Sequence, residues 1–218
     1  MCIRDRSYPF EKLNLLHKDI KPSKEVINLS IGEPKLNADS KVLDILNKET
    51  NSFSNYPPMN AVPELSEAYR QYLKNHFGIE NVAGDEVCLV AGTREGTFSI
   101  IQALFNKENV KEKPYVVMPN PFYQIYGGAT TLAGGEAKFL DCPEEDNFQP
   151  DLDSLKSEDW QKCQILVLCS PNNPTGSVLP LSKLKNIFEL AEKYDFYVVS
   201  DECYVELYTS EKSCPSIL

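Results

Sequence analysis

A turn with the sequence SPNNPTG, at residues 170–176, carries the clearest chemical signal in the chain. Its two prolines fix the backbone angle φ and Gly176 permits an unusual backbone angle, so the turn can hold an amide side chain rigidly. An asparagine amide can donate a hydrogen bond to a phenolic oxygen without bringing a charge. NNP alone also fits a tight loop without a ligand, but the whole string after the apolar run ILVLC favours a binding role.

Residues 91–96 (AGTREG) precede a predicted helix. The free N–H groups and the positive end of a helix start form a natural phosphate site, to which Thr93 can add a hydroxyl. Neither GxGxxG nor GxxxxGK occurs here, so the nucleotide-binding loops do not explain the segment. A helix start without a ligand is the alternative interpretation.

Short apolar runs alternate with stretches of helical periodicity, which is typical of an α/β protein. The expected strands are Val87–Val90, Tyr115–Met118, Ala137–Leu140, Ile165–Cys169 and Phe196–Ser200. The expected helices are Lys41–Glu49, Val62–Phe77, Glu95–Phe105 and one over Leu184–Ala191 with Ser182 as its N-cap.

This order of elements predicts a parallel sheet. The runs ILVLC and FYVVS are apolar at successive positions, as expected of strands covered by helices on both faces. Ligands of such sheets bind beyond the carboxyl ends of the strands. That rule points to four segments that each come directly after an expected strand, namely 91–96, 119–123, 170–176 and 201–204.

The bulk composition excludes several classes of function. The net charge is -10 and the basic residues do not cluster, which argues against nucleic acid as a partner. Seven cysteines without a CxxC pair do not predict a disulfide framework or a zinc site. No apolar run approaches the roughly 20 residues that span a bilayer, so we expect no membrane partner and a cytoplasmic protein.

SPNNPTG resembles the NPTG signature of the fold type I aminotransferases, and SDECY at residues 200–204 resembles the SDExY segment of that family. The resemblance implies pyridoxal 5'-phosphate as cofactor, with Asn173 bonded to its O3′ oxygen. It implies that Asp201 pairs with the pyridinium nitrogen and that Tyr204 donates to O3′. A carboxylate suits that place, because the cofactor accepts electrons only while its ring nitrogen stays protonated.

Other segments extend the resemblance to the cofactor phosphate and ring. The position of AGTREG in the family holds the phosphate, which implies roles for Thr93 and for the backbone of Arg94. PNPFY resembles the NPxY segment, whose aromatic residue stacks on the pyridine ring; here that residue is Tyr123, and core packing is the alternative.

Two N-terminal strings resemble family segments that contact the partner subunit and the substrate. NYP resembles the segment whose tyrosine reaches the phosphate of the neighbouring subunit's cofactor, so Tyr56 implies a homodimer, although a surface turn is a competing interpretation. LSIGEP resembles the loop in which the backbone of a glycine, here Gly32, approaches the substrate carboxylate; a bare turn is the alternative.

The resemblance also implies a domain organisation. We expect residues 51–218 to form the pyridoxal-phosphate-binding large domain, incomplete at its C-terminus, and residues 1–50 to form an N-terminal arm and part of a small domain. Residues 1–7 (MCIRDRS) fit badly with the rest of the N-terminal region and are interpreted as a cloning or assembly leader, or as a frayed native terminus.

Several longer strings, YPFEKL, GTRE, MPNPFYQIYGGA, CSPNNPTG and SDECY, resemble the succinyldiaminopimelate transaminases of lysine biosynthesis. Those enzymes move an amino group between glutamate and N-succinyl-2-amino-6-oxopimelate. Other enzymes of the same fold, such as aspartate or aromatic aminotransferases and C–S lyases, are the nearest alternatives. A regulator with a pyridoxal-phosphate-sensing domain is disfavoured, because it needs an N-terminal winged helix and a basic surface.

The family's Schiff-base lysine lies some 30 or more residues beyond the SDExY tyrosine, which places it after Leu218. Lys212 is only 11 residues after Asp201, within the polar string TSEKS, and does not fit that role. Because a lysine must hold the cofactor and move the proton, we expect these 218 residues alone to bind the cofactor weakly and to have no turnover.

Overall fold

The computed structural model describes most of the chain, namely residues 9–27, 32, 36–56, 63–106, 108, 113–207 and 214–218. The predicted leader at residues 1–7 and Lys212 lie outside the described residues. The chain divides into two compact units, Met1–Pro57 and Pro58–Leu218, which are considered separately.

The first unit contains the short helices α1 (Pro9–His17) and α2 (Ser40–Lys48), followed by a 3-10 turn at Thr50–Ser54. Asp39 is the N-cap of α2, and its side chain accepts a hydrogen bond of 2.8 Å from the backbone N–H of Lys41. This cap satisfies a free helix donor and explains why α2 begins one residue before the predicted start. Among the described residues, every helix is too short or too polar to traverse a lipid bilayer.

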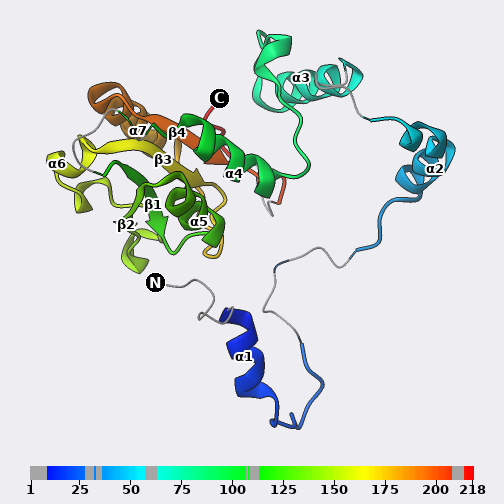
Figure 1. The fold of residues 1–218 in the computed structure, drawn as a ribbon, viewed down its shortest axis with the longest axis horizontal. Coiled ribbons are helices and arrows are strands. Elements are labelled where there is room, and N and C mark those ends of the chain that lie inside the picture. The colour runs from blue at the N-terminus through cyan, green and yellow to red at the C-terminus, as the bar shows by residue number, and fades with distance from the viewer. Residues whose placement is uncertain are drawn as a thin grey trace. The chain divides into compact units, whose positions relative to one another are not determined.

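The second unit is built on a parallel sheet (Figure 1). Its strands are β1 (Tyr115–Asn120), β2 (Glu136–Asp141), β3 (Cys163–Cys169) and β4 (Tyr197–Asp201), in the spatial order β2-β1-β3-β4. All three neighbouring pairs are parallel, which confirms the α/β class predicted from the sequence.

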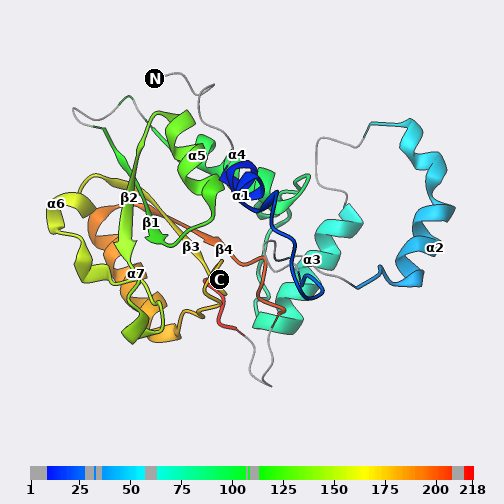
Figure 2. The same cartoon turned by 90° about the horizontal axis from the view of Figure 1, so that it is seen from below.

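Helices cover both faces of this sheet (Figure 2). On one face, α4 (Thr93–Leu104) and α5 (Gln124–Ala133) pack on a cluster of buried side chains: Ile101, Val116, Met118, Tyr126, Ala129, Ile165 and Val167. On the other face, α6 (Ser157–Trp160) and α7 (Leu181–Tyr194) pack on a larger cluster that includes Val117, Trp160, Leu166, Leu168, Ile187 and Phe196. Successive residues of the central strands β1 and β3 thus point to opposite buried faces, which is why these two strands are apolar at most positions.

The strand order creates a switch point between β1 and β3. The chain leaves β1 through α5 to reach β2 on one side, and it leaves β3 through α7 to reach β4 on the other side. Such a reversal opens a crevice at the carboxyl ends of the two central strands, which is where ligands of open α/β sheets bind.

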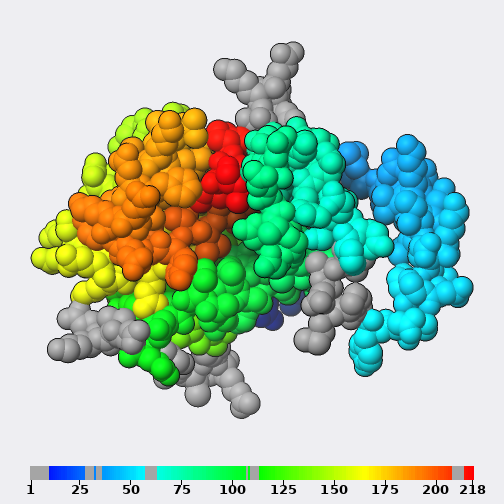
Figure 3. Space-filling model, turned by 90° about the horizontal axis from the view of Figure 1, so that it is seen from above, coloured from blue at the N-terminus to red at the C-terminus, as the bar shows by residue number. Residues whose placement is uncertain are grey.

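Helix α3 (Pro63–Phe77) and the C-terminal residues complete the second unit, and Figure 3 shows the red C-terminal surface against the blue-green surface that includes α3. Tyr72 of α3 donates a 2.6 Å hydrogen bond to Glu206. Glu202 accepts hydrogen bonds from the Ser216 hydroxyl at 2.8 Å and from the Ile217 backbone N–H at 2.9 Å. The carboxylates that come after β4 therefore fix both segments beside the end of that strand.

Short 3-10 turns lie at Gly84–Glu86, Glu144–Asp146 and Leu152–Ser154.

Two sequence-based predictions of secondary structure are wrong. Residues Val87–Val90 form no strand, because no neighbouring strand among the described residues pairs with them; Val90 is half exposed. Ser182 is not the N-cap of α7. The carbonyl of Pro180 accepts the first helical hydrogen bonds, so Ser182 lies within the first turn.

Candidate active site

A pocket of about 120 Å³ lies beyond the carboxyl ends of the strands. The residues that line it are Thr93, Arg94, Tyr123, Tyr126, Cys169, Asn173, Asp201, Cys203 and Tyr204. Six of these nine are residues singled out from the sequence, and they come from four segments that are far apart along the chain. The structure thus brings these predicted side chains to one place. Gly32 and Tyr56 belong to the first unit, and their roles stay predictions.

The start of α4 supplies backbone donors to this pocket. Gly92 is the N-cap with φ of 112°, a backbone angle that other residues rarely adopt, and no side chain caps the helix. The first-turn N–H groups of a helix have no partner within the helix and lie at its positive end. The guanidinium of Arg94 hydrogen-bonds to Glu95 at 2.6 Å and lowers the pKa of that carboxyl. Thr93 and Arg94 line the pocket at this helix start, and their role in binding a phosphate stays a prediction.

Asp201 is held at the end of β4 by two hydrogen bonds. The hydroxyl of Tyr126 donates to its Oδ2 at 2.8 Å, and the backbone N–H of Cys203 donates to its Oδ1 at 3.3 Å. The ladder between β3 and β4 places Asp201 directly beside Cys169. Burial, with the nearby Cys169 and Asp201, raises the pKa of Tyr126 far above its usual value. Tyr126 therefore keeps its proton and acts as a donor.

Asn173 lies in a turn that is fixed from within. The backbone N–H of Asn172 donates to Ser177 O at 2.8 Å, and that of Gly176 donates to Asn172 O at 2.8 Å. The side-chain amide of Asn172 also donates to the hydroxyl of Thr175 at 2.9 Å. These bonds leave Asn173 at the tip of a rigid turn and facing the pocket.

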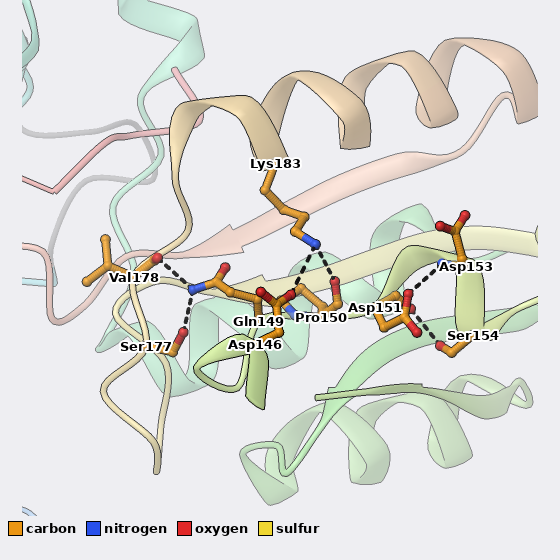
Figure 4. A network of polar contacts seen from close by, with 9 residues as sticks. All are labelled: Asp146, Gln149, Pro150, Asp151, Asp153, Ser154, Ser177, Val178 and Lys183. Carbon is orange, nitrogen blue, oxygen red and sulfur yellow. Dashed lines mark hydrogen bonds and ion pairs between the residues drawn. The ribbon is translucent and has the colours of Figure 1, made fainter. Parts of the chain in front are cut away.

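The segment after β2 braces this turn from outside (Figure 4). The amide nitrogen of Gln149 donates to the Ser177 hydroxyl at 2.6 Å and to Val178 O at 2.8 Å. The ammonium of Lys183 donates to Pro150 O at 3.2 Å, which ties the same segment to α7. A network of side chains outside the pocket lining thus supports the residues that follow the turn, Ser177 and Val178.

Neighbouring side chains support the aromatic residues of the pocket. Tyr123 directly precedes α5, and its ring meets that of Tyr126 edge to face, with 5.7 Å between centroids and 89° between planes. Burial raises the pKa of Tyr204, so its hydroxyl is also a donor at neutral pH. The pocket therefore offers a flat aromatic face and the phenolic hydroxyl of Tyr204, while the hydroxyl of Tyr126 already donates to Asp201.

Three pocket residues were not predicted from the sequence: Tyr126, Cys169 and Cys203. The two thiols adjoin predicted strings, and burial raises the pKa of Cys169 to about 11 and that of Cys203 to about 12. Both are therefore neutral at pH 7 and poor nucleophiles. Tyr126 lies three positions after Tyr123, a spacing that places both on one face of a helix start.

The family model for aminotransferase class I and II matches residues 24–217. The chain belongs to this family. Class I and II aminotransferases depend on pyridoxal phosphate, and the pocket of this aminotransferase chain fits that group. It combines a helix N-terminus, a side-chain amide, a phenolic hydroxyl, a carboxylate and an aromatic face, which are the groups that suit a phosphorylated pyridine with a ring oxygen.

Curated relatives of this aminotransferase chain are named for different substrates. It is 29% identical over 208 residues to aspartate aminotransferase of Pyrococcus horikoshii, covering 94% of this chain and 52% of that protein. It is 29% identical over 214 residues to LL-diaminopimelate aminotransferase of Aquifex aeolicus, covering 97% and 54%.

Solved aminotransferase structures share the fold. The aminotransferase of Neisseria meningitidis is 39% identical with a TM-score of 0.88, covering 97% of this chain and 54% of that one. Aminotransferase AspB of Helicobacter pylori is 35% identical with a TM-score of 0.88, covering 100% and 55%. The chain spans about half the length of the relatives that it matches.

Proposed function

We propose that the pocket binds pyridoxal phosphate and that the protein, at its full natural length, transfers an amino group between glutamate and N-succinyl-2-amino-6-oxopimelate. One observation carries the first part of this proposal: Thr93, Tyr123, Asn173 and Asp201, from four separate segments, line one pocket at the switch point of the sheet. When bound, the cofactor supplies an electron sink for the bonds broken at the amino-acid Cα.

In this proposal, Asp201 holds the proton on the pyridine nitrogen. Its carboxylate lies in a partly enclosed site, where an opposite charge favours the protonated ring. Asn173 and Tyr204 donate hydrogen bonds to the O3′ oxygen of the ring from the ends of β3 and β4. These two neutral donors orient the ring without adding charge beside the carboxylate.

The other pocket residues hold the phosphate and the ring face. The N–H groups at the start of α4, with the hydroxyl of Thr93, bind the phosphate. Tyr123 stacks on the pyridine ring and excludes water from the reacting bonds. We also propose that Tyr56 reaches the phosphate in the partner subunit of a homodimer, that the backbone of Gly32 approaches the substrate carboxylate, and that the protein is cytoplasmic.

The substrate proposal has different support. The strings GTRE, MPNPFYQIYGGA and CSPNNPTG resemble the succinyldiaminopimelate transaminases, and the relatives named LL-diaminopimelate aminotransferase support a substrate of the diaminopimelate class. The relative named aspartate aminotransferase favours a second candidate, in which oxaloacetate is the amino acceptor.

A direct comparison of amino acceptors tests the substrate proposal. The full-length protein is supplied with glutamate and, in turn, with N-succinyl-2-amino-6-oxopimelate, oxaloacetate and an aromatic keto acid, and cystathionine lyase activity is assayed in parallel. We expect the highest kcat/KM with N-succinyl-2-amino-6-oxopimelate, the succinylated keto acid. A higher kcat/KM with oxaloacetate would replace the first candidate by the second. No transfer to any acceptor would refute the proposed activity.

A further inference from the structure

The phenol of Tyr126 is the most deeply buried polar group of the pocket wall. The residue is 1% exposed and lies in the first turn of α5, where its ring belongs to the buried cluster beneath α4 and α5. A buried hydroxyl needs a partner. Its partner here is Asp201 Oδ2 at 2.8 Å, a hydrogen bond that joins residues 75 positions apart.

This hydrogen bond restricts the rotation of the Asp201 carboxylate. Its second oxygen accepts the backbone N–H of Cys203 at 3.3 Å, so each oxygen has a protein donor. A carboxylate oxygen can accept two hydrogen bonds, which leaves acceptor capacity on both oxygens for a group in the pocket. The carboxylate plane is thus set by Tyr126 and Cys203 rather than by the ligand.

The position of the Tyr126 hydroxyl is itself fixed by packing. Its ring packs in a cluster with Ile101, Met118 and Val167, all fully buried, and it also meets the ring of Tyr123 edge to face. A close-packed side chain has little rotational freedom, so its hydroxyl is a rigid reference point. One residue thereby connects the proposed stacking ring to the proposed ring-nitrogen partner.

We infer that Tyr126 is a positioning residue, whose hydroxyl holds the Asp201 carboxylate in the orientation that receives the protonated nitrogen of a pyridine ring. The inference rests on the proposed binding of pyridoxal phosphate. Its physical basis is preorganisation, because a carboxylate that is already oriented loses less freedom when the ring binds. Tyr126 acts through Asp201.

The test compares two ligands on the variant Tyr126→Phe, which keeps the packed ring and removes only the hydroxyl. The first is pyridoxamine 5'-phosphate, which binds without a lysine. The second is its 1-deaza analogue, in which C–H replaces the ring nitrogen. Loss of a hydrogen bond to a charged group predicts about tenfold weaker binding of the first ligand. The second ligand has no N–H for Asp201, and we expect its Kd to change by less than about twofold.

Tyr197→Phe is the matched control, since Tyr197 lies on the same strand as Asp201 but is 59% exposed. It should leave both dissociation constants unchanged. Partial unfolding of a sample lowers the apparent affinity for both ligands equally, so the ratio of the two dissociation constants reports on the hydroxyl alone. In an Asp201→Asn background, Tyr126→Phe should change that ratio much less, because the charged partner is gone.

The possible failures are distinguishable. If the unsubstituted protein binds neither ligand, the proposed cofactor site is wrong and the inference falls with it. If it binds pyridoxamine phosphate but Tyr126→Phe leaves the ratio of the constants unchanged, the cofactor site stands and the positioning role is overturned.

Discussion

The two faces of the central sheet differ in what their helices contribute. On the face of α6 and α7 the cluster is apolar and is closed by Trp160 and Phe196, whose rings stack with centroids 5.5 Å apart. On the face of α4 and α5 the cluster is smaller, and its helices begin at the pocket, where Thr93 is the first residue of α4 and Tyr123 directly precedes α5. The same strands thus support a stabilising face and a binding face. Substitutions on the two faces should therefore separate free energy of unfolding from ligand affinity.

The largest effect on stability is expected from Trp160→Ala, on the α6 and α7 face. Trp160 is 3% exposed, and removal of a large buried aromatic side chain costs about 3–5 kcal/mol of unfolding free energy. Urea unfolding measures this loss. The matched control Leu181→Ala, on an exposed residue of α7, should cost less than about 0.5 kcal/mol. A loss for Trp160→Ala no larger than that of the control would contradict the assignment of stability to this face.

Asp201→Asn should weaken ligand binding strongly and change the unfolding free energy only slightly. We expect the Kd for pyridoxamine 5'-phosphate to rise about 100-fold, because a neutral amide cannot stabilise a protonated ring nitrogen. The change in unfolding free energy should stay below about 1 kcal/mol, since the amide oxygen can still accept the hydroxyl of Tyr126. Calorimetric titration and urea unfolding of the same samples measure both quantities. Unchanged affinity would mean that Asp201 does not face the ring nitrogen.

Gln149→Leu should have a moderate effect on both the unfolding free energy and the Kd for pyridoxamine 5'-phosphate. The variant removes the donor to Ser177 and Val178, and loss of this brace should lower the unfolding free energy by about 1–3 kcal/mol. The Kd should rise only a few-fold, because the turn that carries Asn173 keeps its internal bonds. Gln161→Leu, outside this network, serves as the control. An affinity loss as large as that of Asp201→Asn would show that the brace belongs to the binding site itself.

The smallest effect is expected for Asp159→Asn, which removes an ion pair of 2.9 Å between α6 and Lys138 of β2. Lys138 holds the pKa of the Asp159 carboxyl below its usual value. The stabilisation is therefore present above the unfolded pKa near 4 and is lost as the pH falls through the lower folded pKa. For a partly exposed pair it amounts to less than about 1 kcal/mol. The difference in unfolding free energy between variant and parent should be larger at pH 7 than at pH 3.

Four of the five expected strands form and make the parallel sheet. The central strands β1 and β3 are the clearest in the sequence because their apolar runs are buried, whereas the edge strands β2 and β4 are only partly buried. The sequence does not predict α5, in which the string QIYGGATTLA contains two glycines and two threonines, residues that favour helices weakly. Tertiary contacts account for this helix. An added Cβ at Gly127 would lie 3.2 Å from the ring of Phe122, so the glycine permits a close approach of the helix to that ring.

The chemical residues of the pocket are easier to predict than their supports. Asp201 and Asn173 stand in short strings directly after strands, so their position is set by the order of elements. Tyr126 has no such signal, because a tyrosine within a helix is usually a core residue and its bond to Asp201 depends on how α5 packs on the sheet. The brace from Gln149 likewise depends on a contact between distant loops.

The register in which β4 pairs with β3 decides which side chain faces Tyr126. The hydrogen-bond ladder sets Asp201 opposite Cys169 and Ser200 opposite Leu168. Because side chains alternate between faces, a slip of β4 by a single residue would turn the carboxylate away from Tyr126 and deliver a serine or a glutamate in its place. The carboxylate that we propose as the partner of the ring nitrogen therefore depends both on the identity of residue 201 and on the alignment of two neighbouring strands.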